Sequence, residues 1–274
     1  MPAVLVLLLG ILASVAIWSM ETADEERIAK EKFQANTDGL CKAIQSRMLA
    51  YEQILRGGVS LFATMGDVSR EQWTTYVKGL DVQQNFPGIH GLGYAAYVQA
   101  DKKAEFLAKI RAQALPDYAI RPPGERSEYG PVTYLEPRSE RNLKALGFDM
   151  LAEPTRHEAM VNARDTGKMA ISAKLKLAAE PNQSQAFGFL VYIPVFTNGM
   201  PTRSVEERRV ALRGFVNSPF RIDDLMNGFL QRYSEHMRLQ IYDGEVASPE
   251  HLMYDQHSGA AEKATPLTDR KSVV

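Results

Sequence analysis

The sequence lacks the motifs that identify most enzymes and nucleic-acid-binding proteins. Its 274 residues include a single cysteine, Cys41, which excludes an internal disulfide and a multi-cysteine zinc site. The five histidines form no HExxH motif, and neither a P-loop nor a GxSxG nucleophile turn occurs. Lys and Arg number 32 against 33 Asp and Glu, and this formal net charge of −1 argues against an electrostatic binder of nucleic acids. We therefore expect no metal, no cofactor, no catalytic residue and no nucleic-acid partner.

One uncharged segment is present at the N-terminus, from Pro2 to Met20, and Glu21 follows it at once. About 20 apolar residues cross a bilayer as a helix, and Trp18 has the position of an interfacial aromatic residue. A cleaved signal peptide would carry a basic leader and a shorter apolar core, although Ala13–Ala16 resembles a cleavage site. A buried core helix would be interrupted by polar residues. We predict an uncleaved transmembrane anchor over residues 1–20.

An amphipathic helix is predicted directly after the anchor, over residues 21–66. Apolar side chains recur there at helical spacing, at Phe33, Leu40, Ile44, Met48, Tyr51, Leu55, Val59 and Phe62. The length exceeds that of most globular helices and indicates a stalk that also packs on a domain or on a second copy. Gly57 and Gly58 form a weak point near its end. A plain core helix is the alternative for the second half.

The rest of the chain mixes short helices with strands. Ser69 and Gln72 form a capping box that opens a helix, Asp101 is expected to cap a helix through about Ala114, and Pro154 begins a helix that ends near Gly167. A further helix is expected over 222–230 and a hairpin turn over 180–183. Strands are predicted at 89–100, 118–120, 131–137, 169–178, 186–196, 211–217 and 238–243. This order predicts an α+β fold with antiparallel sheets.

A series of short motifs gives the sequence its resemblance to a known family. They are, in order, Asn85–Gly88, Gly91–Tyr94, Glu128–Val132, Tyr134–Pro137, Leu146–Asp149, Ala163–Gly167, Val191–Val195 and Val205–Arg208. Together they resemble the CHASE family, the extracellular sensory domains of histidine kinases and of diguanylate and adenylate cyclases. The resemblance covers about residues 75–245. From Glu128 to Leu230 the sequence also looks similar to plant cytokinin-receptor ectodomains.

The resemblance implies a sensor domain over residues 67–245, built from two tandem PAS-like modules on the stalk helix. The membrane-distal module would cover about 75–200 and bind the ligand, and the membrane-proximal module would start within about 201–268. The resemblance also implies a homodimer in the inner (plasma) membrane, with the sensor domain in the periplasm. No output domain is present in these residues. We expect the chain to be truncated before a histidine kinase or diguanylate cyclase, and the last six residues, 269–274, to be non-biological.

The resemblance also implies a ligand site, for a purine-like or other small organic molecule. Asp149 falls where family members hold the ligand with a carboxylate, and it lies in an apolar stretch between Phe148 and Met150. Met169 and Ile171 fall on the strand that lines the family's pocket. The other predicted wall residues are aromatic: Tyr129, Tyr134, Phe189 and Tyr192. A helix cap or a salt bridge is the alternative for Asp149, and core packing is the alternative for the others.

The expected function is therefore extracytoplasmic ligand sensing at the input end of a membrane-bound signalling receptor. Two other classes remain open from the residues alone. One is a membrane-anchored periplasmic hydrolase that uses Asp149 and His157 as acid and base. The other is a tethered scaffold protein with no small ligand. The segment from Ala178 to Ala186 departs from the plant receptors, so the resemblance does not carry cytokinin itself to this chain.

Overall fold

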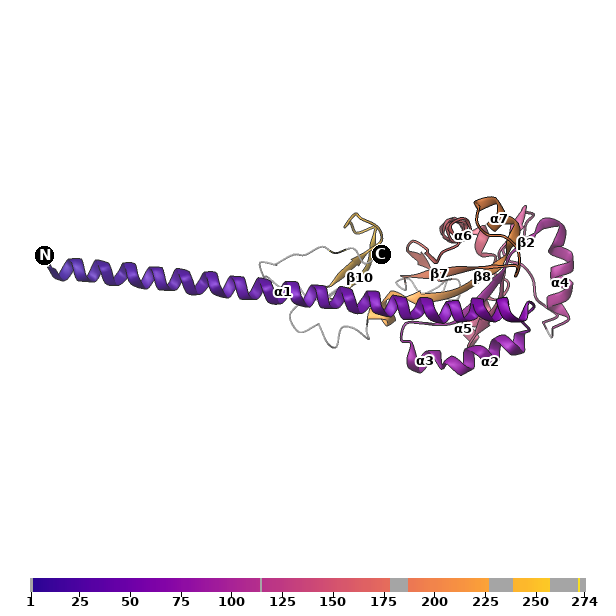
Figure 1. Cartoon of the computed structure of the whole chain (residues 1–274), viewed down its shortest axis with the longest axis horizontal. Helices are drawn as coiled ribbons and strands as arrows, with labels where there is room; N and C mark the ends of the chain where they lie inside the picture. The colour runs from indigo at the N-terminus through magenta and orange to yellow at the C-terminus, as the bar shows by residue number, and fades with distance from the viewer. Residues whose placement is uncertain (1, 114, 178–186, 227–238, 257–270, 272–274) are drawn as a thin grey trace. The chain divides into compact units, whose positions relative to one another are not determined.

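The computed structural model describes residues 2–113, 115–177, 187–226, 239–256 and 271 (Figure 1). The chain divides into two compact units, one formed by Met1–Met48 with Gly259–Val274 and the other by Leu49–Ser258. Helices and antiparallel strands are mixed along the second unit, which confirms the predicted α+β class.

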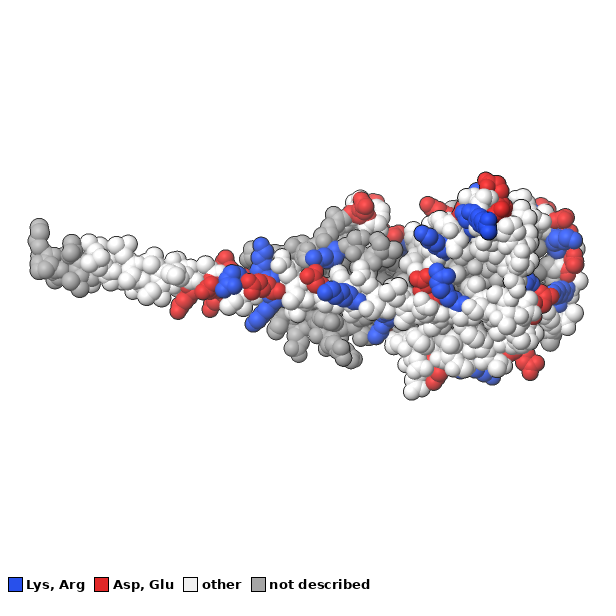
Figure 2. All heavy atoms as spheres, viewed as in Figure 1, with Lys and Arg blue, Asp and Glu red and all other residues white. Residues whose placement is uncertain are grey.

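Helix α1 (Pro2–Met65) begins with the apolar segment. Among the described residues it is the one helix that is long and apolar enough to cross a membrane, and its apolar window is not buried. Figure 2 shows this part of α1 as an uncharged stretch, after which acidic and basic side chains begin. Arg27 there pairs with Asp24 and Glu31 along the helix surface. The helix continues without a break to Met65, where the predicted stalk ends.

The second unit is organised by a six-stranded antiparallel sheet with the order β4-β1-β8-β7-β5, in which β6 also pairs with β7. Its strands are β1 (Leu92–Ala96), β4 (Val132–Glu136), β5 (Ala170–Ile171), β6 (Leu175–Lys176), β7 (Phe187–Phe196) and β8 (Leu212–Arg221). The longest pairing joins β7 to β8, from Gly188 opposite Arg221 to Phe196 opposite Leu212. Strand β8 comes after residue 200 in the sequence but lies between β1 and β7 in this sheet. A boundary between two modules near residue 200 would therefore separate β8 from the strands with which it pairs.

One face of the sheet is covered by the last turns of α1 and by α2 (Arg70–Leu80) and α3 (Val82–Asn85). The Ser69 capping box opens α2 as predicted, and Trp73 is fully buried with its Nε1 donating to the Leu92 carbonyl at 3.3 Å. Gly57 and Gly58 lie where α1 contacts α2. A Cβ at Gly57 would lie 2.4 Å from Tyr76 Oη, so the glycines let α2 approach closely.

The opposite face is covered by α6 (Pro154–Thr166), with α5 (Glu140–Ala145) near β4 and the 3₁₀ turn η2 (Met150–Ala152) between them in sequence. Figure 1 shows α6 and the last turns of α1 on opposite sides of β7 and β8. Proline at the first position and Gly167 at the C-cap, with φ of 70°, bound α6 as predicted. Ala159, Met160 and Ala163 bury its inner face.

Several predicted elements differ from the structure. The strands predicted at 89–100 and 169–178 are each divided into two shorter strands, β1 with β2 (Val98–Gln99) and β5 with β6. Asp101 does not cap a helix, because it lies inside the 3₁₀ turn η1 (Ala100–Lys102) that precedes α4 (Lys103–Arg111). Residues 118–120 form no strand; Tyr118 instead donates its hydroxyl to the Val132 carbonyl at 2.8 Å. Helix α7 (Val205–Ala211) was not predicted, although Ser204 and Glu207 form a capping box there.

Two small sheets complete the described part of this unit. They pair β2 (Val98–Gln99) with β3 (Glu128–Tyr129), and β9 (Gln240–Tyr242) with β10 (Leu252–Asp255). The strand predicted at 238–243 is thereby confirmed as β9. The expected helix over 222–230 is seen for Ile222–Met226, while its remainder and the expected turn at 180–183 lie outside the described residues.

Candidate functional site

A cavity of about 40 Å³ lies between the central sheet and the elements α5, η2 and α6. Most of its wall is apolar, and the main contributors are Val132, Leu135, Ala145, Phe148, Met150 and Leu190. A water molecule needs roughly 10–15 Å³ on such a measure, whereas a cavity of about 150 Å³ admits benzene. The cavity as it stands holds a few heavy atoms.

The polar end of the cavity is formed by His90, which lies in the turn before β1. Its Nδ1 lies 2.8 Å from Arg141 Nη1, and its Nε2 lies 2.6 Å from Asp224 Oδ2. Because arginine can only donate, Nδ1 accepts and Nε2 carries the hydrogen, which is the neutral imidazole. Burial lowers the pKa of His90, whereas the hydrogen bond with Asp224 raises it, and the effect of burial is the larger.

Arg156 on α6 is a charged residue of the cavity wall, and its charge is paired within the fold. Its side chain is 5% exposed, and its Nη1 lies 2.9 Å from Glu153 Oε2. Its Nη2 donates to the Lys176 carbonyl at 2.7 Å, and its guanidinium lies over the Phe148 ring, 5.1 Å from the ring centre. The two arginines at the cavity, Arg141 and Arg156, thus both have partners within the protein.

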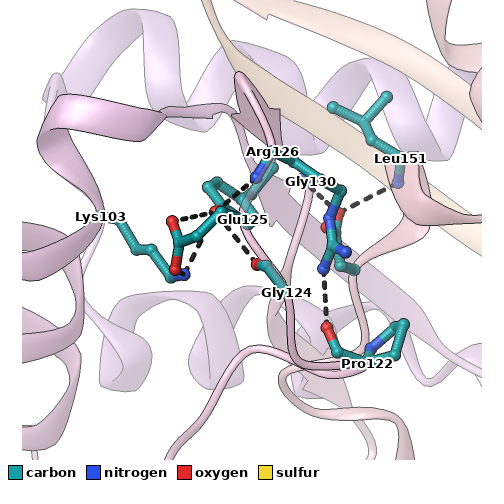
Figure 3. Close-up of polar contacts among 9 residues, drawn as sticks. Lys103, Pro122, Gly124, Glu125, Arg126, Gly130 and Leu151 are labelled. Atoms are coloured by element: carbon teal, nitrogen blue, oxygen red, sulfur yellow. Dashed lines mark hydrogen bonds and ion pairs between the residues drawn. The ribbon is translucent and has the colours of Figure 1, made fainter.

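Asp149 is fully buried next to the cavity. Its carboxylate is engaged by the protein itself, through Arg126, Gly130 and Leu151, which are labelled in Figure 3. Oδ1 accepts from the backbone N–H of Gly130 at 2.7 Å and from that of Leu151 at 3.2 Å. Oδ2 accepts from Arg126 Nε at 2.9 Å, and Arg126 also donates to the Pro122 carbonyl. The carboxylate therefore fastens the loop before β4 to the start of η2.

Tyr129, on the short strand β3, forms a second polar centre with Lys103, Glu125 and Arg126, which are labelled in Figure 3. Its hydroxyl accepts from the backbone N–H of Arg126 at 2.9 Å and from Lys103 Nζ at 3.1 Å. Lys103 also pairs with Glu125 at 2.8 Å, and this hydrogen bond lowers the pKa of the Glu125 carboxyl. Tyr129 thus holds α4 against the loop that Asp149 anchors.

The predicted site residues occupy several places. Phe148 and Met150 line the cavity, and Tyr192 packs in the same core with its hydroxyl 3.4 Å from Met150 Sδ. Tyr134 and Phe189 lie on the opposite face of the sheet, where they pack against Trp73 and Phe220.

Two further predicted residues, Met169 just before the edge strand β5 and Ile171 within it, also lie away from the cavity. Ala170, between them, belongs to the core cluster around the cavity, and successive residues of a strand point to opposite faces. Three residues that line the cavity were not predicted from the sequence: His90, Arg156 and Asn217. Asn217 carried a usable signal, since it is an amide in the middle of the apolar strand Phe215–Phe220.

The hydrolase alternative receives no support from the placement of its two residues. Asp149 is fully buried with three donors, whereas His157 is exposed on α6. Within the described part of the chain, no group of three or more His, Cys, Asp and Glu side chains is placed to bind a metal ion.

Comparison with known proteins identifies residues 66–254 as a CHASE domain, which is more than half of the chain. The chain is 31% identical over 125 residues to Hybrid signal transduction histidine kinase A of Dictyostelium discoideum, which covers 44% of the chain and 6% of that protein. It is 25% identical over 173 residues to Probable histidine kinase 4 of Oryza sativa subsp. japonica, covering 61% of the chain and 16% of the relative. Histidine kinase 3 of Arabidopsis thaliana is 23% identical over 154 residues, with 54% and 14% covered.

The chain therefore spans less than a fifth of the length of each of these relatives. The match lies over the sheet, the cavity and the Asp149 loop described above, and it begins at the end of α1. This chain belongs to the CHASE domain family, and its sensor region is related to those of histidine kinases.

Proposed function

We propose that this chain is the extracytoplasmic, ligand-sensing input domain of a membrane-bound receptor of the histidine kinase or diguanylate cyclase type. The observation that carries the proposal is the mostly apolar cavity, with a few polar groups at one end, inside a CHASE domain. Such cavities are the usual form of small-molecule sites. Helix α1 supports the receptor assignment, since one continuous helix joins a segment able to span a membrane to the sensor fold.

The volume of the cavity limits the size of the ligand. A purine is larger than benzene, so it does not fit a cavity of about 40 Å³ without an outward movement of the wall. A small organic molecule is the better candidate. We place its binding against Phe148, Met150 and Leu190. Direct contact of a ligand with Asp149 stays a prediction, because one of its oxygens would first have to release a donor such as Arg126.

Strand β8 links the cavity to α1. Asn217 and Pro219 line the cavity, while Val216 and Phe220 point to the other face. Phe220 there packs on Tyr51 of α1, with ring centres 5.0 Å apart. We propose that occupancy of the cavity changes how β8 packs on α1, and that a homodimer of the stalk passes this change through the membrane. A ligand shifts such an equilibrium only by its affinity difference between the two states, typically about 1–3 kcal/mol.

Thermal unfolding of the full chain in detergent micelles tests the cavity as a ligand site. The compounds would be small neutral alcohols and amides, short organic acids, amino acids and purines. We expect one class to raise the melting temperature of the wild type. Ala145→Leu, which fills the cavity from α5, should abolish that rise. Val246→Leu, at a position that is 60% exposed and away from the cavity, is the matched control and should retain it.

Two outcomes would count against the proposal. Ligand-dependent stabilisation that survives Ala145→Leu would place binding elsewhere, and turnover of a compound that is lost in both Asp149→Ala and His157→Ala would favour the hydrolase. A tethered scaffold would show neither binding nor turnover. Sequencing the locus beyond the codon for Thr268 tests the receptor assignment separately, since it predicts an open frame with a second apolar span and a kinase or cyclase domain.

A further inference from the structure

One buried polar atom beside the cavity has no partner. Asn217 is 1% exposed, and its Nδ2 lies 3.4 Å from the Phe215 carbonyl, which sets which end of the amide is the oxygen. Among the residues that the structure describes, Oδ1 of Asn217 accepts no hydrogen bond. Nearly all buried polar groups in folded proteins are paired, so this carbonyl oxygen calls for an explanation.

The register of β8 places this amide on the cavity side of the sheet. Phe215 belongs to the core cluster around the cavity, and Asn217 and Pro219 both line the cavity itself. Gly93 lies opposite Asn217 on β1, and a Cβ there would be 3.0 Å from Oδ1. Glycine on the neighbouring strand therefore leaves room beside the unpaired oxygen.

A second buried asparagine of the cavity wall, Asn142, provides a comparison, because its side-chain amide makes hydrogen bonds that hold elements of the fold together. Asn142 on α5 is 2% exposed, and its Nδ2 donates to the carbonyls of Pro137 at 2.9 Å and His90 at 3.1 Å. These two bonds fasten α5 to the end of β4 and to the turn before β1. Asn217 fastens nothing with its oxygen, so its polarity lowers the stability of the empty fold.

We infer that Asn217 is the polar anchor of the cavity, and that the cavity takes a small, neutral, otherwise apolar molecule whose single hydrogen-bond donor pairs with Asn217 Oδ1. This inference rests on the proposed function and adds the chemical class of the ligand. The donor follows from Oδ1, which can only accept. A neutral ligand agrees with the wall in that the charge of Arg156 is paired with Glu153 and Arg141 already donates to His90. The size follows from the volume of about 40 Å³.

The test compares propan-2-ol with acetone, two molecules of nearly equal size that differ in the presence of a donor. Binding to the full chain in micelles is followed by NMR, through the side-chain amide of Asn217 and the methyl groups of Val132 and Leu190. The Asn217 amide signal is assigned from its absence in Asn217→Leu. We expect saturable shifts with propan-2-ol, at least about tenfold weaker binding of acetone, and no such preference in Asn217→Leu.

The two asparagines give the matched control. Asn217→Leu should melt a few degrees higher than the wild type, because it removes an unpaired buried acceptor, whereas Asn142→Leu should melt lower, because it removes two hydrogen bonds. A structural role for Asn217 would instead make both variants melt lower. That result overturns the anchor role, and so does equal binding of both molecules to the wild type.

Xenon distinguishes failure of this inference from failure of the proposed function. Xenon needs only an apolar cavity and should shift the methyl signals of Val132 and Leu190 in both the wild type and Asn217→Leu. Xenon binding without any preference for propan-2-ol would leave the cavity in place and remove the anchor role. No binding of xenon, propan-2-ol or acetone would remove the cavity as a ligand site, and the proposed function with it.

Discussion

The two faces of the central sheet are built differently. The face under α1 and α2 is filled by aromatic side chains, and the ring centres of Phe62 and Tyr94 lie only 4.2 Å apart there. The polar ends of these aromatic side chains are satisfied, as when Tyr134 donates to the Val68 carbonyl at 2.9 Å and Tyr76 to the Ile54 carbonyl at 2.8 Å. The face under α5 and α6 retains a cavity and an unpaired amide at Asn217.

This difference indicates that one face of the sheet serves stability and the other serves binding. Close aromatic packing stabilises a single structure, so the α1 face provides rigidity to the domain, even though Arg70 Nε on α2 has no hydrogen-bond partner among the described residues. A cavity and an unpaired acceptor both lower the stability of the empty state, and a bound molecule can recover that loss. We therefore expect substitutions on the first face to act on folding, and comparable substitutions on the second face to act mainly on binding.

The largest expected effect lies on the packed face. Trp73 is fully buried between α1 and the sheet, so Trp73→Ala should lower the free energy of unfolding by about 3–5 kcal/mol. Urea unfolding of the full chain in micelles, followed by circular dichroism, measures the change. Val210→Ala, at an exposed position, should stay within about 0.5 kcal/mol of the wild type. A loss below 1 kcal/mol at Trp73 would contradict the assignment of this face to stability.

The second effect concerns the loop beside the cavity. Asp149→Ala leaves the buried N–H of Gly130 without an acceptor and should cost about 1–3 kcal/mol of unfolding free energy. Glu125→Ala, in the neighbouring polar centre, should cost far less because its side chain is 85% exposed. Urea unfolding distinguishes the two variants. Equal stability of Asp149→Ala and the wild type would mean that the carboxylate does not fasten the loop, and would favour its direct contact with a ligand.

The sequence predicted the elements of this fold better than it predicted the site. Residues with a local signal were placed correctly: the apolar run from Pro2, the Ser69 capping box, and Pro154 with Gly167 around α6. Asp101 failed because a cap depends on where the chain leaves the preceding strand, which local sequence does not reveal. The position of Tyr134 and Phe189 on the packed face depends on strand order and on a register shift within β1 and β4, neither of which is visible in one sequence.

The third prediction places the same substitution on both faces. Val216 is fully buried toward α1, where its Cγ1 would lie 3.3 Å from a Cβ at Gly58, so Val216→Ile should overpack and cost about 1–3 kcal/mol. Val132 is equally buried but lines the cavity, so the added methylene of Val132→Ile has space and should be neutral or stabilising by up to about 2 kcal/mol. Equal losses at both positions, measured by urea unfolding, would show that the cavity offers no room.

The smallest expected effect is the dependence of stability on pH that His90 contributes on the cavity face. Burial lowers the pKa of His90 in the folded state, so the unfolded chain binds more protons once the pH falls below the ordinary value near 6.5. The contribution of His90 to stability is therefore complete above pH 6.5 and is lost as the pH falls toward the folded-state pKa. One proton changes the unfolding free energy by at most about 1.4 kcal/mol per pH unit. Tyr76 on the packed face does not titrate in this range, because burial raises its pKa to about 12.

Urea unfolding between about pH 5 and pH 7 measures this dependence. Two variants that shift the pKa of His90 in opposite directions test whether His90 is the titrating group. The charged groups facing His90 are Asp224, Arg141 and Arg221; Asp224 raises its pKa and the two arginines lower it. Asp224→Asn should therefore lower the pKa of His90 further and steepen the loss of stability toward pH 5, whereas Arg141→Met should make it shallower. His90→Gln should remove the contribution. A profile that stays unchanged in His90→Gln and changes in Tyr76→Phe would reverse the assignment of the two faces, because the titrating group would then belong to the packed side.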